Sequence, residues 1–328
     1  MKRTTLSVGI PSYNEANTIA TVLSTVLCEP LPPGCELVST VISDCSTDAT
    51  PEILERFTIA RPDFIKVIHH TFRTGLNLAI NEIFENANTD FLLYINADSL
   101  PAAGSISSLV ESMLSDESVG AVSAAMIPVP VGQSFVERAG VFGAGVFQRL
   151  RESSRSFHGR MFMIRGKLAR KVRLPVDAIE QDAFISCSIR EMGFRVEYLR
   201  SAICYYSPPS TLRDYVLPNR LYRIGTQTWK QQHPKWEKSG MLRDAASINQ
   251  NTIKAILGEA ASDPSGALVW TFLKIVEKFY PTRDLERRYQ SKPVAQSTKV
   301  LRSKLRHTST TSTLSANTAR EYPPNQSS

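Results

Sequence analysis

Apolar and polar positions in the first half of the chain predict four strand–helix pairs in succession. Each pair begins with a short apolar run and continues with a longer segment whose apolar residues recur at helical spacing. Repeated units of this kind build a mostly parallel sheet with helices on both faces, because parallel neighbours need a crossover connection. The predicted pairs are residues 6–10 with 17–27, 36–43 with 51–60, 65–69 with 75–86, and 91–95 with 105–114.

The pattern becomes less regular after residue 126. Residues 127–159 carry prolines and glycines without a clear period, and they are followed by a predicted strand at 161–164, a helix at 181–192 and a strand at 195–199. Thr211 and Asp214 are spaced as a capping box that opens a further helix. We expect a catalytic domain over residues 1–232, with halves of about 1–126 and 127–232, and a helical extension over 233–285.

One apolar run ends abruptly in polar residues. Residues 91–95 form an uninterrupted apolar segment, and Asn96, Ala97 and Asp98 follow it directly. Side chains two positions apart on an extended chain project the same way, so Asn96 and Asp98 present two oxygen donors together. Such oxygens suit Mg²⁺ or Mn²⁺ bound with substrate phosphates. An Asx turn that closes the strand is an equally good interpretation of the triplet.

Three further polar loops follow or precede predicted elements. Pro11, Tyr13 and Glu15 follow the first strand, and Asp44 follows the second. A doubly wound sheet brings the carboxyl ends of its strands to one edge, where ligands bind. Asp182 begins a helix, where a carboxylate is stabilised as an anion and is also able to serve as a general base.

Composition and charge narrow the functional class. The chain has 328 residues, 42% of them hydrophobic, and a net charge of +7. Residues 281–328 hold nine Lys or Arg against three Asp or Glu, which leaves 29 against 28 in residues 1–280. A nearly neutral body argues against a nucleic-acid groove. Five cysteines without a CxxC pair indicate neither a disulfide framework nor a zinc site.

These motifs together resemble family 2 glycosyltransferases of the GT-A fold, an α/β class with a mostly parallel central sheet. The resemblance covers residues 5 to 230 and rests on the order and spacing of short motifs. They are VGIPSYNE at 8–15, DCSTD at 44–48, GLNLAIN at 75–81, NAD at 96–98, QD at 181–182 and GFRV at 193–196.

The resemblance implies an inverting transfer of a sugar from a nucleotide-diphosphate donor, often a UDP-sugar, to an acceptor hydroxyl. Carried over by position, the nucleotide-binding residues are Pro11, Tyr13, Glu15, Asp44 and Asn96. Asp98 is the implied ligand of Mn²⁺ or Mg²⁺, and Asp182 is the implied catalytic base.

The chain departs from the family pattern at several positions. Relatives usually carry Asp at the positions of Ser43 and Asn96 and often Glu at that of Gln181. Polymerising relatives also carry a Gln and an Arg-Trp pair where this chain has Arg220, Arg223 and Ile224. We therefore expect a single addition, with Arg220 and Arg223 either contacting the diphosphate or acceptor or lying on a solvated helical face.

The C-terminal region raises the question of a membrane. No apolar run approaches the about 20 residues that span a bilayer, so we expect a cytoplasmic protein. Ala267 to Tyr280 is amphipathic and precedes a basic Ser/Thr-rich segment, 286–328, which is expected to be disordered. Either this helix packs on the body, or it attaches the protein to the cytoplasmic face of a membrane, where the acceptor would be lipid-linked rather than a free glycan or small molecule.

The sequence leaves one rival function open and argues against another. The lost acids at Ser43, Asn96 and Gln181 are also consistent with a catalytically silent protein of the same fold that binds a sugar nucleotide or a partner. A nucleotidyltransferase would need a glycine-rich basic loop after its first strand, and residues 11–17 contain none.

Overall fold

The protein is built around one eight-stranded mixed sheet. The computed structural model describes residues 3–154, 157–176, 178, 180–220, 233–238 and 250–280. The strand order is β3-β2-β1-β4-β7-β6-β8-β5. The strands are β1 Thr4–Ser12, β2 Cys35–Asp44, β3 Ile65–His69, β4 Phe91–Ile95, β5 Ser99–Pro101, β6 Val119–Pro128, β7 Met161–Arg165 and β8 Arg195–Tyr206.

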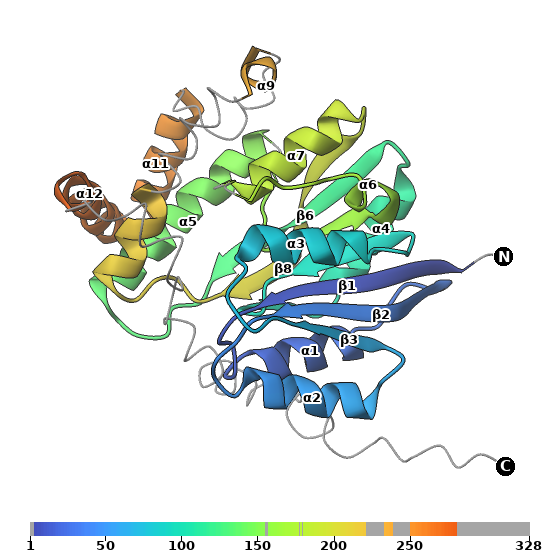
Figure 1. Cartoon of the computed structure of the whole chain (residues 1–328). Coiled ribbons are helices and arrows are strands. Elements are labelled where there is room, and N and C mark those ends of the chain that lie inside the picture. The colour runs from blue at the N-terminus through green and yellow to red at the C-terminus, as the bar shows by residue number, and fades with distance from the viewer. Residues whose placement is uncertain are drawn as a thin grey trace, which may run out of the picture.

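Helices cover both faces of this sheet, as Figure 1 shows. The helices of the first half are α1 Ile19–Cys28, α2 Thr50–Ala60, α3 Leu76–Glu85 and α4 Ser105–Ser115. Those of the second half are α5 Phe135–Ser154, α6 Gly166–Ala169, α7 Gln181–Glu191, α9 Pro234–Lys238, α11 Gln250–Ser262 and α12 Pro264–Phe279. The four predicted strand–helix pairs are therefore present.

The apolar run of β4 divides the core into two layers. Phe91, Leu93 and Ile95 pack in a cluster with α1, α2 and α4, whereas Leu92 and Tyr94 pack in a second cluster with α3, α6 and α7. All five side chains are buried because successive residues of a strand face opposite sides of the sheet. A strand covered on both faces needs an uninterrupted apolar sequence, which this segment has.

Strand direction changes at the middle of the sheet. β3, β2, β1 and β4 pair in parallel, as the strand–helix pattern predicts. β7 runs antiparallel to both β4 and β6, and β5 runs antiparallel to β8. The antiparallel β7 brings the residues that precede Met161 back to the carboxyl end of β4.

The segment predicted as irregular is largely one helix. α5 runs for 20 residues through the glycines that suggested a loop. Gly143 packs against the indole of Trp270, and Gly145 packs against the carboxylate of Glu259. The glycines of α5 are explained by the close approach of α12 and α11, so the prediction of irregular structure is wrong here.

The C-terminal helices lie against α5 at one side of the molecule (Figure 1). Thr211 and Asp214 form the predicted capping box, with Oγ1 of Thr211 donating to Oδ2 of Asp214 at 2.8 Å. Within the described ranges, no helix combines the length and apolar character needed to cross a bilayer. Residues 286–328 lie outside the described part, and the proposed division into domains stays a prediction.

Candidate functional site

The loops that follow β1, β2 and β4 meet at one edge of the sheet. Ser12 lies beside Asp44 in the parallel β1–β2 pairing, and Asp44 lies beside His69 in the β2–β3 pairing. Because β1 also pairs in parallel with β4, the residues after Ile95 leave the sheet at this same edge. The sequence-predicted loops therefore converge where ligands of α/β sheets bind.

Asp44 is the most buried carboxylate of this edge, with 1% of its surface exposed. Oγ of Ser46 donates to its Oδ1 at 2.6 Å, and Nδ1 of His69 lies 3.4 Å from its Oδ2. These contacts fix the orientation of the carboxylate. A carboxylate held in this way is suited to accept a hydrogen bond from the N–H of a base.

Tyr13 provides an aromatic surface at the same edge. The guanidinium carbon of Arg73 lies 4.7 Å from the centre of its ring. Arg73 comes from the exposed loop between β3 and α3, and the sequence analysis does not identify it. Pro11 lies beside Ser43 in the β1–β2 pairing and shapes the backbone that leads to Tyr13.

Asn14 joins the first two loops by hydrogen bonds. It adopts the left-handed backbone conformation, with φ 58°. Its Oδ1 accepts a hydrogen bond from the backbone N–H of Thr47 at 2.8 Å, and its own N–H donates to Oγ of Ser46 at 2.8 Å. Oδ1 of Asp48 accepts from the N–H of Thr50 at the start of α2. Ser46, Thr47 and Asp48 therefore hold these two loops and the start of α2 in place.

Glu15 lies between the two halves of the site. Oγ1 of Thr18 donates to its carboxylate at 2.8 Å. Burial and, next in importance, the negative charge of Asp98 together raise the pKa of Glu15 to about 8. A carboxyl group with this pKa is mostly protonated at neutral pH, so it is able to donate a hydrogen bond to a ligand oxygen.

Asp98 is paired with an arginine from the opposite strand. Nη1 of Arg160 lies 2.9 Å from Oδ1 and 2.8 Å from Oδ2 of Asp98, and Oγ of Ser99 donates to Oδ1 at 3.1 Å. The guanidinium carbon of Arg160 lies 4.6 Å from the centre of the Tyr206 ring. The antiparallel pairing of β7 with β4 accounts for this placement, because Arg160 directly precedes β7.

Two buried oxygens at the centre of the edge have no hydrogen-bond partner within the described residues. They are Oγ of Ser12, at the end of β1, and Oδ1 of Asn96, directly after β4. Buried polar atoms in native proteins are nearly always bonded, so such atoms indicate a place for water, an ion or a ligand. They lie after neighbouring strands of the sheet.

The donor set near Asp98 fits a divalent cation that arrives with phosphate oxygens. In the described part of the chain, no three His, Cys, Asp or Glu side chains form a protein-only metal cluster. Mg²⁺ and Mn²⁺ commonly need only one or two protein oxygens when a substrate supplies the others. Asn96 has an unpaired buried carbonyl oxygen, and an ionised carboxylate such as Asp98 has more lone pairs than its bonds to Arg160 use.

Asp182 lies at the start of α7, where its Oδ1 accepts a hydrogen bond from the N–H of Ala183 at 2.9 Å. A side chain added at Gly159 would meet Cβ of Asp182 at 3.0 Å, so the backbone at Gly159 is packed against Asp182. Because Arg160 follows Gly159, consecutive residues contact Asp182 and Asp98. The structure thus links the two predicted carboxylates through two consecutive residues, with Gly159 packed against Asp182 and Arg160 paired with Asp98.

Two asparagines of α3 hold the loop that leads to Asp182. Nδ2 of Asn77 donates to the carbonyl oxygens of Pro175, Val176 and Ala178, at 2.8–2.9 Å. Asn81 bonds both the N–H and the carbonyl oxygen of Leu174. The sequence analysis used these asparagines only as a motif, and the structure gives them a positioning role.

A sequence model described as Glycosyl transferase family 2 matches residues 7–173. This match covers just over half of the 328 residues. The chain belongs to glycosyl transferase family 2. Pro11, Tyr13, Glu15, Asp44, Asn96 and Asp98 lie inside the matched range, whereas Asp182 lies beyond its end.

Two curated relatives agree with this family. The chain is 24% identical over 233 residues to "Probable glycosyltransferase YdaM" of Bacillus subtilis, which covers 68% of this chain and 55% of that protein. It is 35% identical over 125 residues to "Glycosyltransferase AglD" of Haloferax volcanii, covering 38% of this chain and 20% of that protein. The chain thus spans about half the length of the first relative and a fifth of the second.

A solved structure supports the predicted GT-A fold. It is the mannosyltransferase PcManGT from Pyrobaculum calidifontis, in complex with GDP-Man and Mn²⁺. The TM-score is 0.53 at 21% sequence identity, and the match covers 88% of this chain and 79% of that chain. At this identity the likeness concerns the fold, which confirms the predicted fold class.

Two departures from the family pattern have partners in the structure. Oγ of Ser43 donates to Oε2 of Glu82 at 2.7 Å, and Nε2 of His70 lies 2.9 Å from the same oxygen. Nε2 of Gln181 donates to Oδ1 of Asn77 at 2.8 Å. An acidic side chain from α3 therefore lies beside Ser43, and Gln181 belongs to the amide contacts that hold the loop before α7.

Arg220 has structural partners at the end of α12. Its guanidinium donates to the carbonyl oxygens of Lys278 and Tyr280 at the C-terminal end of α12, where the last carbonyls of a helix attract cations. A contact of Arg220 with the diphosphate or acceptor stays a prediction. Arg223 lies outside the described residues.

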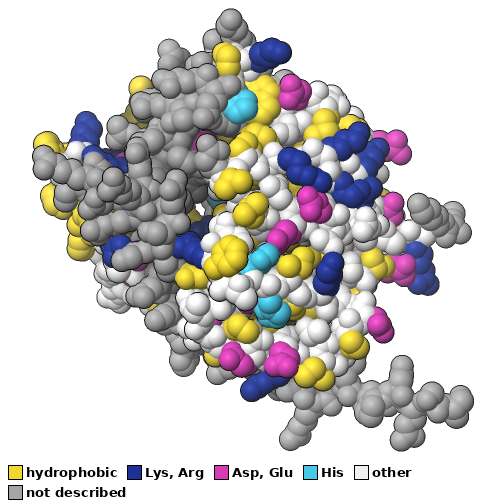
Figure 2. Space-filling view, in the orientation of Figure 1, with side chains coloured by type: hydrophobic (Ala, Val, Ile, Leu, Met, Phe, Trp, Pro, Cys, Tyr) yellow, Lys and Arg dark blue, Asp and Glu magenta, His cyan; other side chains and the backbone are white. Residues whose placement is uncertain are grey.

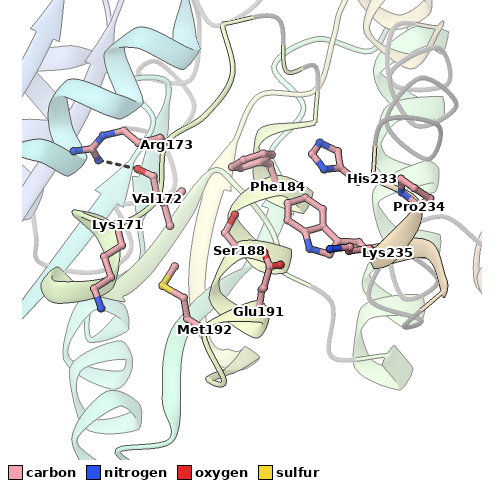
Figure 3. A pocket seen from close by; sticks show the side chains of 11 residues that line it. Lys171, Val172, Arg173, Phe184, Ser188, Glu191, Met192, His233, Pro234 and Lys235 are labelled. Carbon is pink, nitrogen blue, oxygen red and sulfur yellow. Dashed lines mark hydrogen bonds between the residues drawn. The ribbon is translucent and has the colours of Figure 1, made fainter.

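A cavity of about 760 Å³ lies on the other side of α7 (Figure 3). Phe184, Ser188 and Glu191 line it, and they lie about 180–240° around the helix from Asp182 at 100° per residue. Trp236 closes it, with its ring stacked on His233 at 4.4 Å between centres. None of the predicted site residues lines this cavity, so it is separate from the edge that carries Asp98.

Arg160 is the most important site residue that the sequence analysis missed. It directly precedes β7, whose first four residues are apolar, and a cation next to this apolar run was the available signal. Its contact with Asp98 depends on the antiparallel return of β7, which the strand–helix pattern does not predict.

Proposed function

We propose that this chain transfers one sugar from a nucleotide-diphosphate donor, with UDP as the nucleotide, to an acceptor hydroxyl with inversion. The observation that supports the proposal is that two consecutive residues contact the two carboxylates, because Gly159 packs against Asp182 and Arg160 pairs with Asp98. A displacement of this type needs a charge-stabilised leaving group on one side and a base on the other.

The nucleoside would bind across β1 and β2. Tyr13 supplies a stacking surface and Asp44 a fixed acceptor, while Pro11 sets the backbone beneath them. Glu15, whose pKa is raised to about 8, would donate a hydrogen bond to a phosphate or ribose oxygen. The Asp44 carboxylate would accept a hydrogen bond from the base, and the protonated Glu15 would donate one to the anionic diphosphate or the ribose without repelling the diphosphate.

The diphosphate would bind beside Asp98, Asn96 and Arg160. Asp98 and Asn96 would hold a Mn²⁺ or Mg²⁺ ion, which would offset the charge that develops on the leaving diphosphate. Arg160 adds a cation fixed by Tyr206 and Asp98. Oγ of Ser12 and Oδ1 of Asn96 would gain the partners that they lack.

Asp182 would accept the proton of the attacking hydroxyl. Its place at the start of α7 stabilises the ionised form that a base requires. A single displacement with one base on the face opposite the leaving group inverts the anomeric centre. The guanidinium of Arg220 bonds the carbonyl oxygens at the end of α12, and this engagement supports a single addition.

A catalytically silent nucleotide-binding protein is the second candidate. The observation that favours it is the pairing of Asp98 with Arg160 in a site where Asn96 and Ser43 replace acids. Such a protein would bind the donor without turning it over.

Asp182→Asn separates the two candidates. We expect turnover or donor hydrolysis to fall by about 10²–10⁴-fold, as loss of a general base does, while UDP binding measured by calorimetry stays unchanged. Asp116→Asn, at the end of α4, is the matched control and should retain turnover. Equal turnover in wild type and Asp182→Asn would refute the role of Asp182, and a wild type that binds UDP with no turnover would favour the silent protein.

A further inference from the structure

The outward face of α12 carries an apolar stripe. Leu268, Phe272, Ile275 and Phe279 are spaced 4, 3 and 4 residues apart and are 74%, 58%, 51% and 81% exposed. This spacing places them on one face of a helix. Surface helices usually turn polar side chains outward, so four large apolar residues on the outer face of one helix require an explanation.

The inner face of α12 is firmly packed, so the stripe does not result from a loosely placed helix. Leu273 and Glu277 are buried, and Nζ of Lys274 lies 2.8 Å from Oε2 of Glu277. Asp263 accepts a hydrogen bond from the N–H of Gly266 at the start of the helix, and Arg220 caps its end. The helix is fixed at both ends with its stripe facing outward.

Charge on the outward face has one sign. Glu277 is the one acid of α12, and it is buried and paired. Lys278 is exposed beside Phe279. The neighbouring helix α11 also combines exposed apolar residues with a lysine. Ile253 is 56% exposed, Leu257 is 64% exposed, and Lys254 is exposed beside Ile253. Figure 2 shows hydrophobic and basic side chains together at the edge where Figure 1 places α12.

The sequence after α12 adds positive charge next to this face. Residues 281–328 carry nine Lys or Arg and three Asp or Glu, and this segment directly follows Tyr280, the residue after the end of α12. An apolar stripe flanked by lysines and joined to a basic segment complements an anionic lipid surface, which combines an apolar interior with negative headgroups.

We propose that α12, with the exposed residues of α11, docks on an anionic lipid surface. A second copy of the chain fits the face less well. Lys254 and Lys278 are exposed beside the apolar residues of this face. The lipid surface uses these lysines, which would repel one another across a symmetric dimer.

The test is flotation of the full chain with vesicles of phosphatidylcholine alone and of phosphatidylcholine with phosphatidylglycerol. We expect wild type to float with the mixed vesicles, and the double variant Phe272→Glu and Phe279→Glu to lose about tenfold or more of this binding. The control is the double variant Ile59→Glu and Leu114→Glu, which changes two exposed apolar residues of α2 and α4 and should bind as wild type does. Circular dichroism and thermal unfolding verify that both variants fold.

Three results would overturn the proposal. Wild type that floats with neither vesicle type would exclude a lipid surface. Equal flotation of wild type and the Phe272→Glu, Phe279→Glu variant would assign binding to the basic segment alone. A wild-type dimer in sedimentation velocity that the same variant dissociates, without any vesicle binding, would assign the stripe to a second copy of the chain.

Discussion

The outer and central parts of the candidate site differ in how their polar groups are satisfied. Around Asp44, the carboxylate, Ser46 and Asn14 bond one another within the protein. At the centre, Oγ of Ser12 and Oδ1 of Asn96 lack partners within the described residues. The outer part is prepared before a ligand binds, whereas the central part has hydrogen-bonding capacity that a ligand would satisfy.

Electrostatics follows the same division. Nδ1 of the half-exposed His69 lies 3.4 Å from Oδ2 of the buried Asp44. Glu15 and Asp98 lie close enough for the charge of Asp98 to raise the pKa of Glu15, and Arg160 compensates part of that charge. Charged side chains are thus concentrated where the diphosphate is proposed to bind, whereas side-chain orientation is fixed by hydrogen bonds where the nucleoside is proposed to bind.

Arg160→Ala should have the largest effect on the central part. Turnover is expected to fall by about 10²–10³-fold, because one fixed donor beside the developing charge is removed. Arg160→Lys, which keeps the charge, should recover part of the loss. The control is Arg195→Ala, which removes an exposed arginine that pairs with Asp116 and Glu197. Initial rates within twofold of wild type for Arg160→Ala would show that the arginine has no part in the reaction.

Asn96→Asp should strengthen metal binding at the centre by about tenfold, because a carboxylate replaces an amide beside Asp98. The measurement is the Mn²⁺ concentration needed for half-maximal donor binding. Asn86→Asp, at the end of α3, provides the matched control. An unchanged Mn²⁺ requirement in Asn96→Asp would mean that the orphaned oxygen does not face the metal.

Glu15 gives the central part a pH dependence. Its folded pKa, about 8, lies above the ordinary value of 4.5, so the folded state holds a proton that the unfolded state releases between these values. Stability should therefore fall as pH rises from about 5 to 8. Glu15→Gln should remove this fall. In thermal unfolding, the drop in Tm between pH 5 and pH 8 should be smaller in Glu15→Gln than in wild type by at least about 3 °C.

The control is Glu36→Gln, at a half-buried glutamate that pairs with Arg3 away from the site, and it should leave the pH profile unchanged. A wild-type profile that is flat between pH 5 and 8, or a Glu15→Gln profile that falls as steeply as wild type, would contradict the raised pKa.

Asn77→Ala should have the smallest effect, acting on the position of Asp182 from outside the site. Loss of the bonds from its buried side chain to three carbonyl oxygens is expected to lower the free energy of unfolding by about 1–3 kcal/mol. Denaturant unfolding measures this loss. Asn219→Ala, which removes one bond within a helix, should cost less. An equal cost for both variants would refute the special role of Asn77.

The first half of the fold was predictable because its signals are local. The apolar run of β4 and the strand–helix pairs follow from periodicity, and Asp44 and Asp98 follow from the ends of strands. The helix α5 was not predictable in this way. Its glycines serve contacts with Trp270 and Glu259, more than 100 residues later in the chain, and local sequence does not report such contacts.

The same limit applies within the site. Asp98 was predicted from its position after β4, but its partner Arg160 comes from the antiparallel β7. Arg220 was assigned from the family pattern, while the structure bonds it to the end of α12, 58 residues further along the chain. Strand ends are visible in sequence, whereas the partners of a side chain depend on the tertiary fold.

In the proposed function, Asp98 binds the metal ion that holds the donor diphosphate. Calorimetric titration of UDP into wild type and Asp98→Ala, with and without Mn²⁺, tests it most directly. We predict that Mn²⁺ raises the UDP affinity of wild type by at least about tenfold, a difference of about 1.4 kcal/mol, and leaves that of Asp98→Ala unchanged. The same increase in both proteins would contradict the account.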